Sequence, residues 1–353
     1  IDHDVAETVP DAFVLENDLV CYEFSENGEV LSAYDKEEGR SILRGMGNQL
    51  SLYIDKPVND DAWDIDLYYR KQRVGTAQGL HAEKISCGKL RSTLRFELKI
   101  GNSTVLQAVS LESRSKRLDF HNLVDWNESH RMLRVSFETA ILADEAAFDI
   151  QYGFVKRPTH ANTLSDMAKF EAAGQRYADI SESTYGVALL NDCKYGYYVK
   201  NGTLDLGLLR SPKYPDWNAD ICKHEFSYAL LPHRGSLTAS DVMRESACFN
   251  RIPFCLPGYV SGAIEPPCRI EGDGITLEAI KKAEKGNNVI VRIVENLGTC
   301  NCATLVLRDP KAEIVETNLI EWGEGIHFTP KDGRIEIKFS PFEIKTLRIC
   351  SCH

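Results

Sequence analysis

The chain has 353 residues, enough for two or three β domains or one large one, and its 43% hydrophobic and 26% charged residues exclude a disordered or fibrous protein. The formal net charge is −11 and the basic residues are scattered singly or in pairs, so no nucleic-acid partner is predicted. No run approaches the roughly 18 apolar residues of a membrane span, so no membrane partner is predicted either.

Period-two alternation of apolar and polar residues marks the first part of the chain. In 93–100 the apolar residues Leu, Phe, Leu and Ile occupy every second position, which is typical of a half-buried strand. Asn27-Gly28 lies between the strand-like segments 19–25 and 29–34, with the chemistry of a type I′ hairpin turn. These patterns predict antiparallel strands joined by short turns.

Further strand-like segments make most of 80–245 a large predicted sandwich. They are 118–126, 133–137, 185–190, 204–209 and 226–231. The segment 165–177 is ambiguous. It has apolar residues at helical spacing and Ser165 placed to cap, but Gly174 argues against a long helix.

Prolines and glycines crowd into 253–267, the clearest linker in the chain. Five strand-like segments then predict a second, smaller β module: 275–279, 289–294, 304–307, 334–339 and 345–349. Asp332-Gly333 has type I′ chemistry and is expected to join 326–329 to 334–339 in a hairpin. The predicted organisation is a first β segment, a large sandwich, the linker and a small C-terminal module, at 1–80, 81–252, 253–267 and 268–353.

The 11 cysteines are odd in number, and Cys21, Cys193 and Cys248 are interpreted as lone thiols inside apolar strands. That usage favours a reducing compartment, so a cytoplasmic location is predicted. Cys300-Asn-Cys302 and the terminal Cys350-Ser-Cys352-His353 match no common zinc knuckle, and no metal site is predicted in this chain. The start at Ile1, without a leader, is expected to be internal to a longer protein.

A dense polar and aromatic block at 59–69 is the first candidate for chemistry. It holds four carboxylates and three aromatic residues within eleven positions. Carbohydrate sites use this pairing, because carboxylates accept hydrogen bonds from hydroxyls while rings cover the apolar faces of a sugar. A polar loop with one buried Trp is the structural alternative.

Three further blocks stand out. Segment 148–163 is a strand that leads into a polar loop with His160, and 185–197 is a buried strand that enters a tight turn. In 208–212, Arg210 ends a hydrophobic strand, and 224–228 follows it. A lone Arg or His in such a place is more often a satisfied structural residue than a catalytic one.

In this order and spacing, the blocks resemble the carboxy-terminal region of glycoside hydrolase family 38, the α-mannosidases of the cytosolic and bacterial type. The resemblance covers nearly the whole chain. It rests on a set of short motifs: Asn48-Gln-Leu, Ala62-Trp-Asp-Ile-Asp66, Leu118-Asp-Phe, Val124-Asp-Trp126, Arg157-Pro-Thr-His160, 185–197 and Leu231-Pro-His233.

The resemblance implies an all-β fold: a large antiparallel β super-sandwich of the galactose mutarotase-like kind, followed by a smaller β-sandwich module. It also implies a longer retaining enzyme whose nucleophile, acid/base and zinc ligands lie in an N-terminal catalytic domain that this chain lacks. No catalytic residue and no cofactor is then expected here. By the same resemblance, the ambiguous segment 165–177 is extended.

The resemblance places five residues as candidates for the wall of the substrate pocket: Asp60, Trp63, Asp64, His160 and Arg210. The expected partners are an α-mannoside and the missing catalytic domain, and homo-oligomerisation stays open. Two alternatives also stay open. A stand-alone carbohydrate-binding module would expose Trp63, Trp126, Trp217 or Trp322 as a platform, and a mutarotase-like enzyme would set a His against a carboxylate across a concave sheet.

Overall fold

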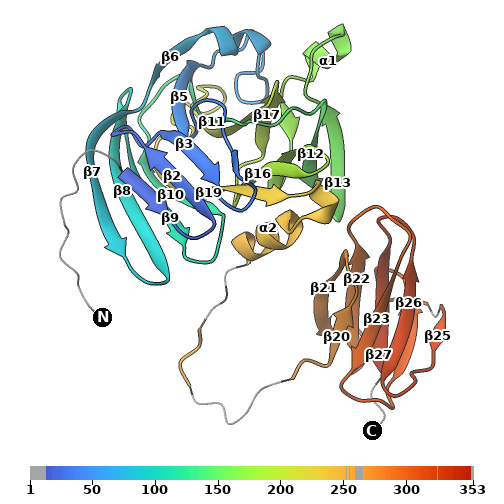
Figure 1. Ribbon diagram of the computed structural model, residues 1–353. Helices are drawn as coiled ribbons and strands as arrows, with labels where there is room; N and C mark the ends of the chain where they lie inside the picture. The colour runs from blue at the N-terminus through green and yellow to red at the C-terminus, as the bar shows by residue number, and fades with distance from the viewer. Residues whose placement is uncertain (1–12, 252, 254, 259–264, 324, 351–353) are drawn as a thin grey trace. The chain divides into compact units, whose positions relative to one another are not determined.

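The computed structural model describes residues 13–251, 253, 255–258, 265–323 and 325–350. The chain divides into two compact units (Figure 1). Of the described residues, the first unit holds 13–149 and 155–251, and the second holds 150–154 and those from 253 onward. The predicted linker 253–267 lies in part outside the described residues, and the predicted domain boundaries stay predictions.

The first unit contains a nine-stranded and a six-stranded sheet. In spatial order the nine strands are β13 (Gly153–Pro158), β12 (Glu145–Ile150), β15 (Tyr177–Ser181), β16 (Tyr185–Asn191), β19 (Lys223–Arg234), β10 (Leu118–Asp125), β9 (Ser103–Glu112), β8 (Arg91–Ile100) and β7 (Gln78–Cys87). The six are β14 (Ala172–Ala173), β17 (Gly196–Lys200), β18 (Thr203–Arg210), β11 (Arg131–Glu138), β5 (Gln49–Ile54) and β6 (Arg73–Thr76). A four-stranded sheet precedes them, made of β1 (Phe13–Glu16), β2 (Val20–Phe24), β3 (Val30–Asp35) and β4 (Arg40–Ser41).

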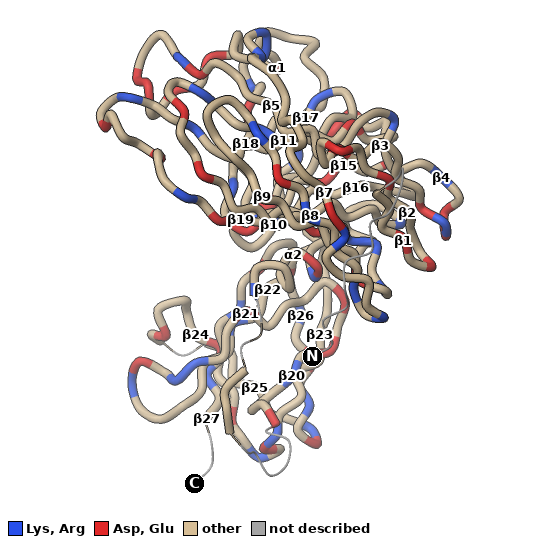
Figure 2. Tube along the Cα trace, turned by 90° about the vertical axis from the view of Figure 1, so that its left-hand side faces the viewer, with Lys and Arg blue, Asp and Glu red and all other residues tan. Residues whose placement is uncertain are grey.

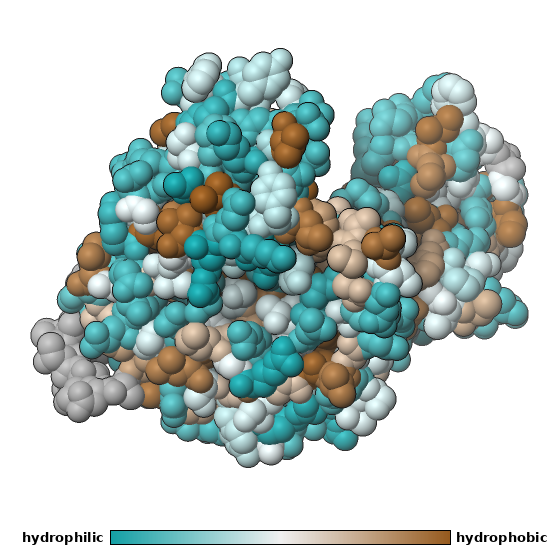
Figure 3. Space-filling model, turned by 90° about the horizontal axis from the view of Figure 1, so that it is seen from above, coloured by the Kyte–Doolittle hydropathy of each residue, from teal (hydrophilic) through white to brown (hydrophobic). Residues whose placement is uncertain are grey.

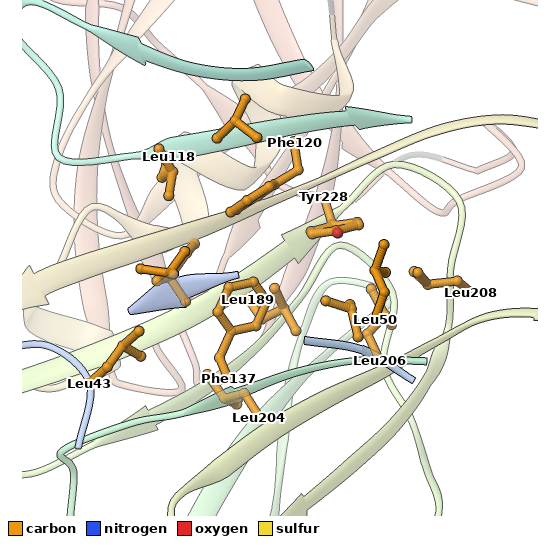
Figure 4. Packing of buried hydrophobic residues seen from close by; sticks show 14 of the residues in the cluster. Leu43, Leu50, Leu118, Phe120, Phe137, Leu189, Leu204, Leu206, Leu208 and Tyr228 are labelled. Carbon is orange, nitrogen blue, oxygen red and sulfur yellow. The ribbon is translucent and has the colours of Figure 1, made fainter. Parts of the chain in front are cut away.

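The alternation seen in the sequence places the core between the two large sheets. The alternate apolar residues of β8 are all buried, as predicted. Phe120 of β10 stacks on Tyr228 of β19, with ring centroids 5.0 Å apart, and both rings contact Phe137 of β11 in the facing sheet. Figure 4 shows this aromatic group among leucines from both sheets. The predicted all-β, antiparallel sandwich is therefore confirmed.

Buried polar residues of the core are paired with one another. The Asn48 amide donates to Gln107 Oε1 at 2.7 Å, and the Tyr228 hydroxyl donates to Asn48 Oδ1 at 2.6 Å. Gln107 in turn donates to Asn122. The Asn48 motif noted in the sequence thus satisfies polar groups inside the sandwich.

Local structure departs from the predictions at two places in this unit. At Asn27-Gly28 only Gly28 has a positive φ, of 74°, so the turn is not of type I′, which needs a positive φ at both positions. The segment 165–177 is extended only in part, because α1 (Leu164–Ala168) forms one short helix before β14. Thr163, rather than Ser165, caps it, in a reciprocal capping box with Asp166.

The remaining helices of the described chain are short and were not predicted. They are the 3₁₀ turns η1 (Leu67–Lys71) and η2 (Leu237–Ala239) and the helix α2 (Val242–Asn250). No helix among the described residues is long and apolar enough to cross a membrane. Acidic and basic residues are interspersed along both units (Figure 2).

The second unit is a smaller pair of antiparallel sheets. Three strands form one: β20 (Cys268–Glu271), β23 (Asn301–Leu307) and β26 (Arg334–Phe339). Five strands form the other: β21 (Ile275–Lys282), β22 (Val289–Glu295), β27 (Ile344–Cys350), β24 (Glu313–Thr317) and β25 (His327–Phe328).

The Asp332-Gly333 turn has the predicted backbone but not the predicted partners. Both residues have a positive φ, of 51° and 72°, and Lys331 and Arg334 exchange backbone hydrogen bonds around them. However, β25 pairs with β24, whereas β26 pairs with β23 in the other sheet. The expected hairpin between 326–329 and 334–339 is therefore wrong, because the chain changes sheets at this turn.

The cysteines differ from their predicted surroundings. Cys21 lies on β2 and is half-buried, but Cys193 is in an exposed loop and Cys248 is exposed on α2. The interpretation of Cys193 and Cys248 as thiols inside apolar strands was wrong, since apolar neighbours in the sequence do not decide which face a residue takes.

Candidate functional site

One loop and one strand end carry four of the five predicted site residues. The loop 55–66 follows β5 and contains Asp60, Trp63 and Asp64, while Arg210 is the last residue of β18. Strand β11 lies between β5 and β18 in the six-stranded sheet. The sheet therefore brings these residues, far apart in the sequence, to the same end of three neighbouring strands.

Arg210 holds the loop through most of its guanidinium donors. Nε and Nη2 donate to the two carboxylate oxygens of Asp55, at 2.6 and 3.1 Å, and Asp55 is only 2% exposed. Nη2 also donates to the backbone carbonyls of Asp64, at 2.7 Å, and Asp61, at 3.2 Å. Nη1 donates to the carbonyl of Ala62 at 3.4 Å. These combined contacts make Arg210 a positioning residue for the loop.

The loop turns three of its carbonyls towards Arg210 and leaves the three predicted side chains that it carries exposed. Asp60 adopts a φ of 50°, and its carbonyl accepts hydrogen bonds from the amides of Trp63, at 2.7 Å, and Asp64, at 3.0 Å. The Trp63 side chain is 69% exposed, and Asp60 and Asp64 are exposed as well. Two carboxylates and one indole ring are thus presented on a backbone that the protein fixes.

Four residues of this site were missed by the sequence reasoning, namely Asp55, His130, Lys213 and Tyr214, while Asp61 lay within the candidate block 59–69 but was not chosen as a site residue. Asp61 Oδ2 accepts hydrogen bonds from the backbone amides of Lys213 and Tyr214, and Asp61 Oδ1 lies 3.6 Å from His130 Nδ1, an ion pair only if the imidazole is protonated. Burial raises the pKa of Asp55, and the Arg210 guanidinium offsets part of that shift. For Asp55, the signal in the sequence was its position directly after the buried segment 49–54.

His160 lies on a different loop. Its Nδ1 is 3.6 Å from the carboxylate of Asp166 at α1, and its carbonyl accepts a hydrogen bond from Lys200 Nζ. Among the contacts of the described residues, none joins His160 to the loop 55–66. The structure therefore groups Asp60, Trp63, Asp64 and Arg210, and leaves His160 apart.

A buried charge cluster joins η1 to the six-stranded sheet, just after the loop 55–66. The Arg134 Nε donates to Asp205 Oδ1 at 2.5 Å, and Arg70 Nη1 donates to Asp205 Oδ2 at 2.6 Å. Glu171 Oε1 accepts from the Tyr69 hydroxyl at 2.5 Å and lies 3.2 Å from Arg134 Nη1. Two cations and two anions compensate one another, so the cluster fixes the segments at 67–71 and 171 on the sheet.

Stability should depend on pH through Glu171. Burial raises the pKa of its carboxyl, and Arg134 offsets part of the shift. A carboxyl with a raised folded pKa contributes stability that is fully present below its unfolded pKa of about 4.3 and is lost as the pH rises through the folded pKa. We expect the unfolding free energy of wild type, relative to Glu171→Gln, to fall as the pH rises from about 4 to about 7.

Urea unfolding of both proteins across this range would measure the difference. Glu97→Gln, at an exposed position of β8, is the matched control. Its unfolding free energy should differ from that of wild type by the same amount at every pH. If the unfolding free energy of wild type, relative to Glu171→Gln, instead rose with pH, the raised pKa of Glu171 would be contradicted.

Other possible centres are closed or absent. His233 Nε2 and Asp179 Oδ2 are 2.7 Å apart, but these side chains are only 7% and 2% exposed, so a solute has little access to them. Within the described residues, no group of three His, Cys, Asp or Glu side chains could hold a metal ion. Cys352 and His353 of the terminal motif lie outside the described residues.

Two family models match the chain. The "Glycosyl hydrolases family 38 C-terminal domain" matches residues 15–218, and the "Glycosyl hydrolases family 38 C-terminal beta sandwich domain" matches 274–347. Together they span both units.

Curated relatives are similar over nearly the whole chain. "Alpha-mannosidase G" of Dictyostelium discoideum is 35% identical, over 96% of this chain and 32% of its own length. "Alpha-mannosidase 2C1" of Homo sapiens is 34% identical, over 97% of this chain and 34% of its own length. The chain therefore spans about a third of the length of the curated relatives it matches.

A solved structure shares the fold. An alpha-mannosidase from Enterococcus faecalis V583 superposes with a TM-score of 0.77 over 95% of this chain and 42% of its own, at 16% sequence identity. At this identity the likeness supports the fold alone.

Proposed function

The chain belongs to glycosyl hydrolase family 38, whose C-terminal domains it contains, and from this premise we propose that it is the C-terminal β portion of a retaining α-mannosidase that hydrolyses terminal α-linked mannose. Its role in that enzyme is to provide a scaffold and one wall of the substrate pocket. The catalytic domain is the partner, and corresponds to part of the two thirds of the relatives' length that this chain does not span.

The loop anchored by Arg210 carries this proposal. It presents Trp63 beside the carboxylates of Asp60 and Asp64, all exposed, on a backbone held by hydrogen bonds from one guanidinium. An indole ring can cover the apolar face of a pyranose, and carboxylates accept hydrogen bonds from its hydroxyls. Arg210 acts by positioning these groups. His160 is proposed as a more remote contact from its own loop.

The bond-breaking residues are proposed to lie in the catalytic domain. Retention requires two carboxyl groups about 5 Å apart, one as nucleophile and one as acid/base. Zinc, where it is bound, would hold and orient sugar hydroxyls; the described residues of this chain include no group that fits it. No catalytic step is therefore assigned to this chain.

A cytoplasmic location is part of the proposal. The ten cysteines of the described chain are all free, as expected in a reducing compartment.

A stand-alone carbohydrate-binding module is the second candidate, and exposed rings favour it. Trp63, Trp217 and Trp322 are 69%, 75% and 62% exposed, although Trp126 is buried in the core. Binding of a free mannoside by this chain without a catalytic domain would support the module over the pocket wall. The mutarotase-like alternative has weaker support, because the His233–Asp179 pair is nearly inaccessible.

Removal of one carboxylate tests the pocket wall. In the enzyme that joins this chain to its catalytic domain, Asp64→Ala is expected to raise KM for an aryl α-mannoside about tenfold, because a charge-assisted hydrogen bond to a hydroxyl is lost. The variant keeps the backbone carbonyl that Arg210 binds.

Asp18→Ala is the control, at an exposed turn between β1 and β2. Steady-state kinetics of the three proteins would measure KM and kcat. Equal KM values for Asp64→Ala and Asp18→Ala would remove Asp64 from the pocket, and an inactive wild-type enzyme would contradict the proposed function itself.

A further inference from the structure

A second loop lies against the loop 55–66, which carries Trp63. The segment 211–222 connects β18 to β19, and its first three residues are buried, whereas Tyr214 is 67% exposed. Lys213, within the buried stem, donates from Nζ to the carbonyl of Trp217 at 2.8 Å. The loop is therefore held by its stem while its ring residues remain uncovered.

Asp61 ties the two loops into one unit. Its Oδ2 accepts hydrogen bonds from the amide of Lys213, at 2.6 Å, and from the amide of Tyr214, at 3.1 Å. Its backbone carbonyl accepts from Arg210. A carboxylate bonded to two amides fixes the Tyr214 backbone relative to the loop that carries Trp63.

The two rings meet at this junction. Trp63 and Tyr214 lie edge to face, with ring centroids 6.4 Å apart and an angle of 63° between their planes. Each ring of such a pair has a large apolar area that burial would remove from water. Here both rings are about two-thirds exposed on an anchored backbone. Seen from above, the surface is mostly hydrophilic, with hydrophobic residues in separate small groups (Figure 3).

We propose that Tyr214 is a further substrate-contacting residue, whose ring forms with Trp63 a two-ring wall against the apolar face of a mannosyl unit. The proposal deepens the proposed function and rests on it. The carboxylates of Asp60 and Asp64 beside the wall favour a ligand rich in hydroxyl donors. The Tyr214 hydroxyl adds a group that can donate or accept at the rim of the wall.

A polypeptide surface is the competing occupant, because the catalytic domain could cover the same rings. The sugar and the polypeptide predict different effects when the ring of Tyr214 is removed. A sugar contact changes KM and leaves the association of the two domains intact, whereas a domain contact lowers the stability of the joined enzyme.

The test uses the enzyme that joins this chain to its catalytic domain, with an aryl α-mannoside and an α-linked mannobiose as substrates. Tyr214→Ala is expected to raise KM about tenfold, equivalent to about 1.4 kcal/mol, with kcat within about threefold and Tm unchanged. Tyr214→Phe, which keeps the ring, should stay within about threefold of wild type. Tyr34→Ala, at an exposed tyrosine of β3, is the matched control and should leave KM unchanged.

Each other outcome overturns the proposal. A KM for Tyr214→Ala equal to that of Tyr34→Ala, on both substrates, would remove Tyr214 from the wall while the proposed function stands. An unchanged KM with a lowered Tm would assign the rings to the domain interface. A wild-type enzyme inactive on both substrates would overturn the proposed function and this inference with it.

Discussion

Arg210→Ala is expected to destabilise the first unit by about 3 kcal/mol, at the lower end of the cost of breaking a buried ion pair because Arg210 is itself partly exposed. The substitution leaves the carboxylate of Asp55 without a counter-charge at 2% exposure, and frees the carbonyls of the loop 55–66. Urea unfolding of the 353-residue chain, followed by near-ultraviolet circular dichroism, would measure the loss. The catalytic efficiency of the joined enzyme should fall as well, because Trp63 is no longer held.

The pH dependence identifies Asp55 as the cause. Burial already raises its pKa, and removal of Arg210 removes the group that lowers it. In Arg210→Ala, the contribution of Asp55 to stability is then present below its unfolded pKa of about 3.9. It is lost as the pH rises through the raised folded pKa. The stability that Arg210→Ala loses relative to wild type should therefore become smaller as the pH falls to about 4, which is near the unfolded pKa of Asp55.

A double variant provides the control. Arg210→Ala with Asp55→Asn should recover part of the loss, because no charge is left buried. Equal stability of wild type and Arg210→Ala at neutral pH would refute the anchoring role. A double variant less stable than Arg210→Ala would show that the unpaired charge of Asp55 does not cause the lost stability.

The second large effect is expected from separating this chain from its catalytic domain. The 353-residue chain alone should hydrolyse no aryl α-mannoside and bind no stoichiometric zinc, since we propose that the nucleophile, acid/base and zinc ligands lie in that domain. Positioning and transition-state electrostatics supply most of the rate of a hydrolase, and they act only where these groups are held together. The rate should therefore differ from that of the joined enzyme by orders of magnitude.

Release of nitrophenol and metal analysis of the purified chain would check this. Addition of the separately produced catalytic domain, with a mock addition as control, should restore turnover if the two parts dock. Turnover by the chain alone, with equimolar metal, would overturn the assignment of roles. Saturable mannoside binding without turnover would instead favour the carbohydrate-binding module.

Part of the site could be predicted from the sequence because its residues form a local group. Asp60, Trp63 and Asp64 lie within five positions, and a local density of carboxylates and rings is by itself typical of sugar contact. The role of Arg210 could not be predicted. Its partner Asp55 is 155 residues away, and the contact exists only because β5 and β18 flank β11.

Tyr214 was missed for the same reason. Its neighbourhood does hold two rings and a carboxylate within 214–217, but the contact of Tyr214 with Trp63 depends on the hydrogen bonds between Asp61 and the 213–214 backbone. The charge cluster around Arg134 was missed too, since an Arg inside a strand is expected to face solvent unless a sheet and η1 cover it.

By itself the sequence determined the class of fold and most of the strands, because the side-chain period of two and the chemistry of turns are local properties of the chain. The Asp332-Gly333 turn shows the limit: its backbone was predictable, but its strands belong to different sheets. Only the tertiary structure decided which strands pair, which loops meet and which charges are buried. These depend on contacts between residues far apart in the chain, whose energies no local pattern records.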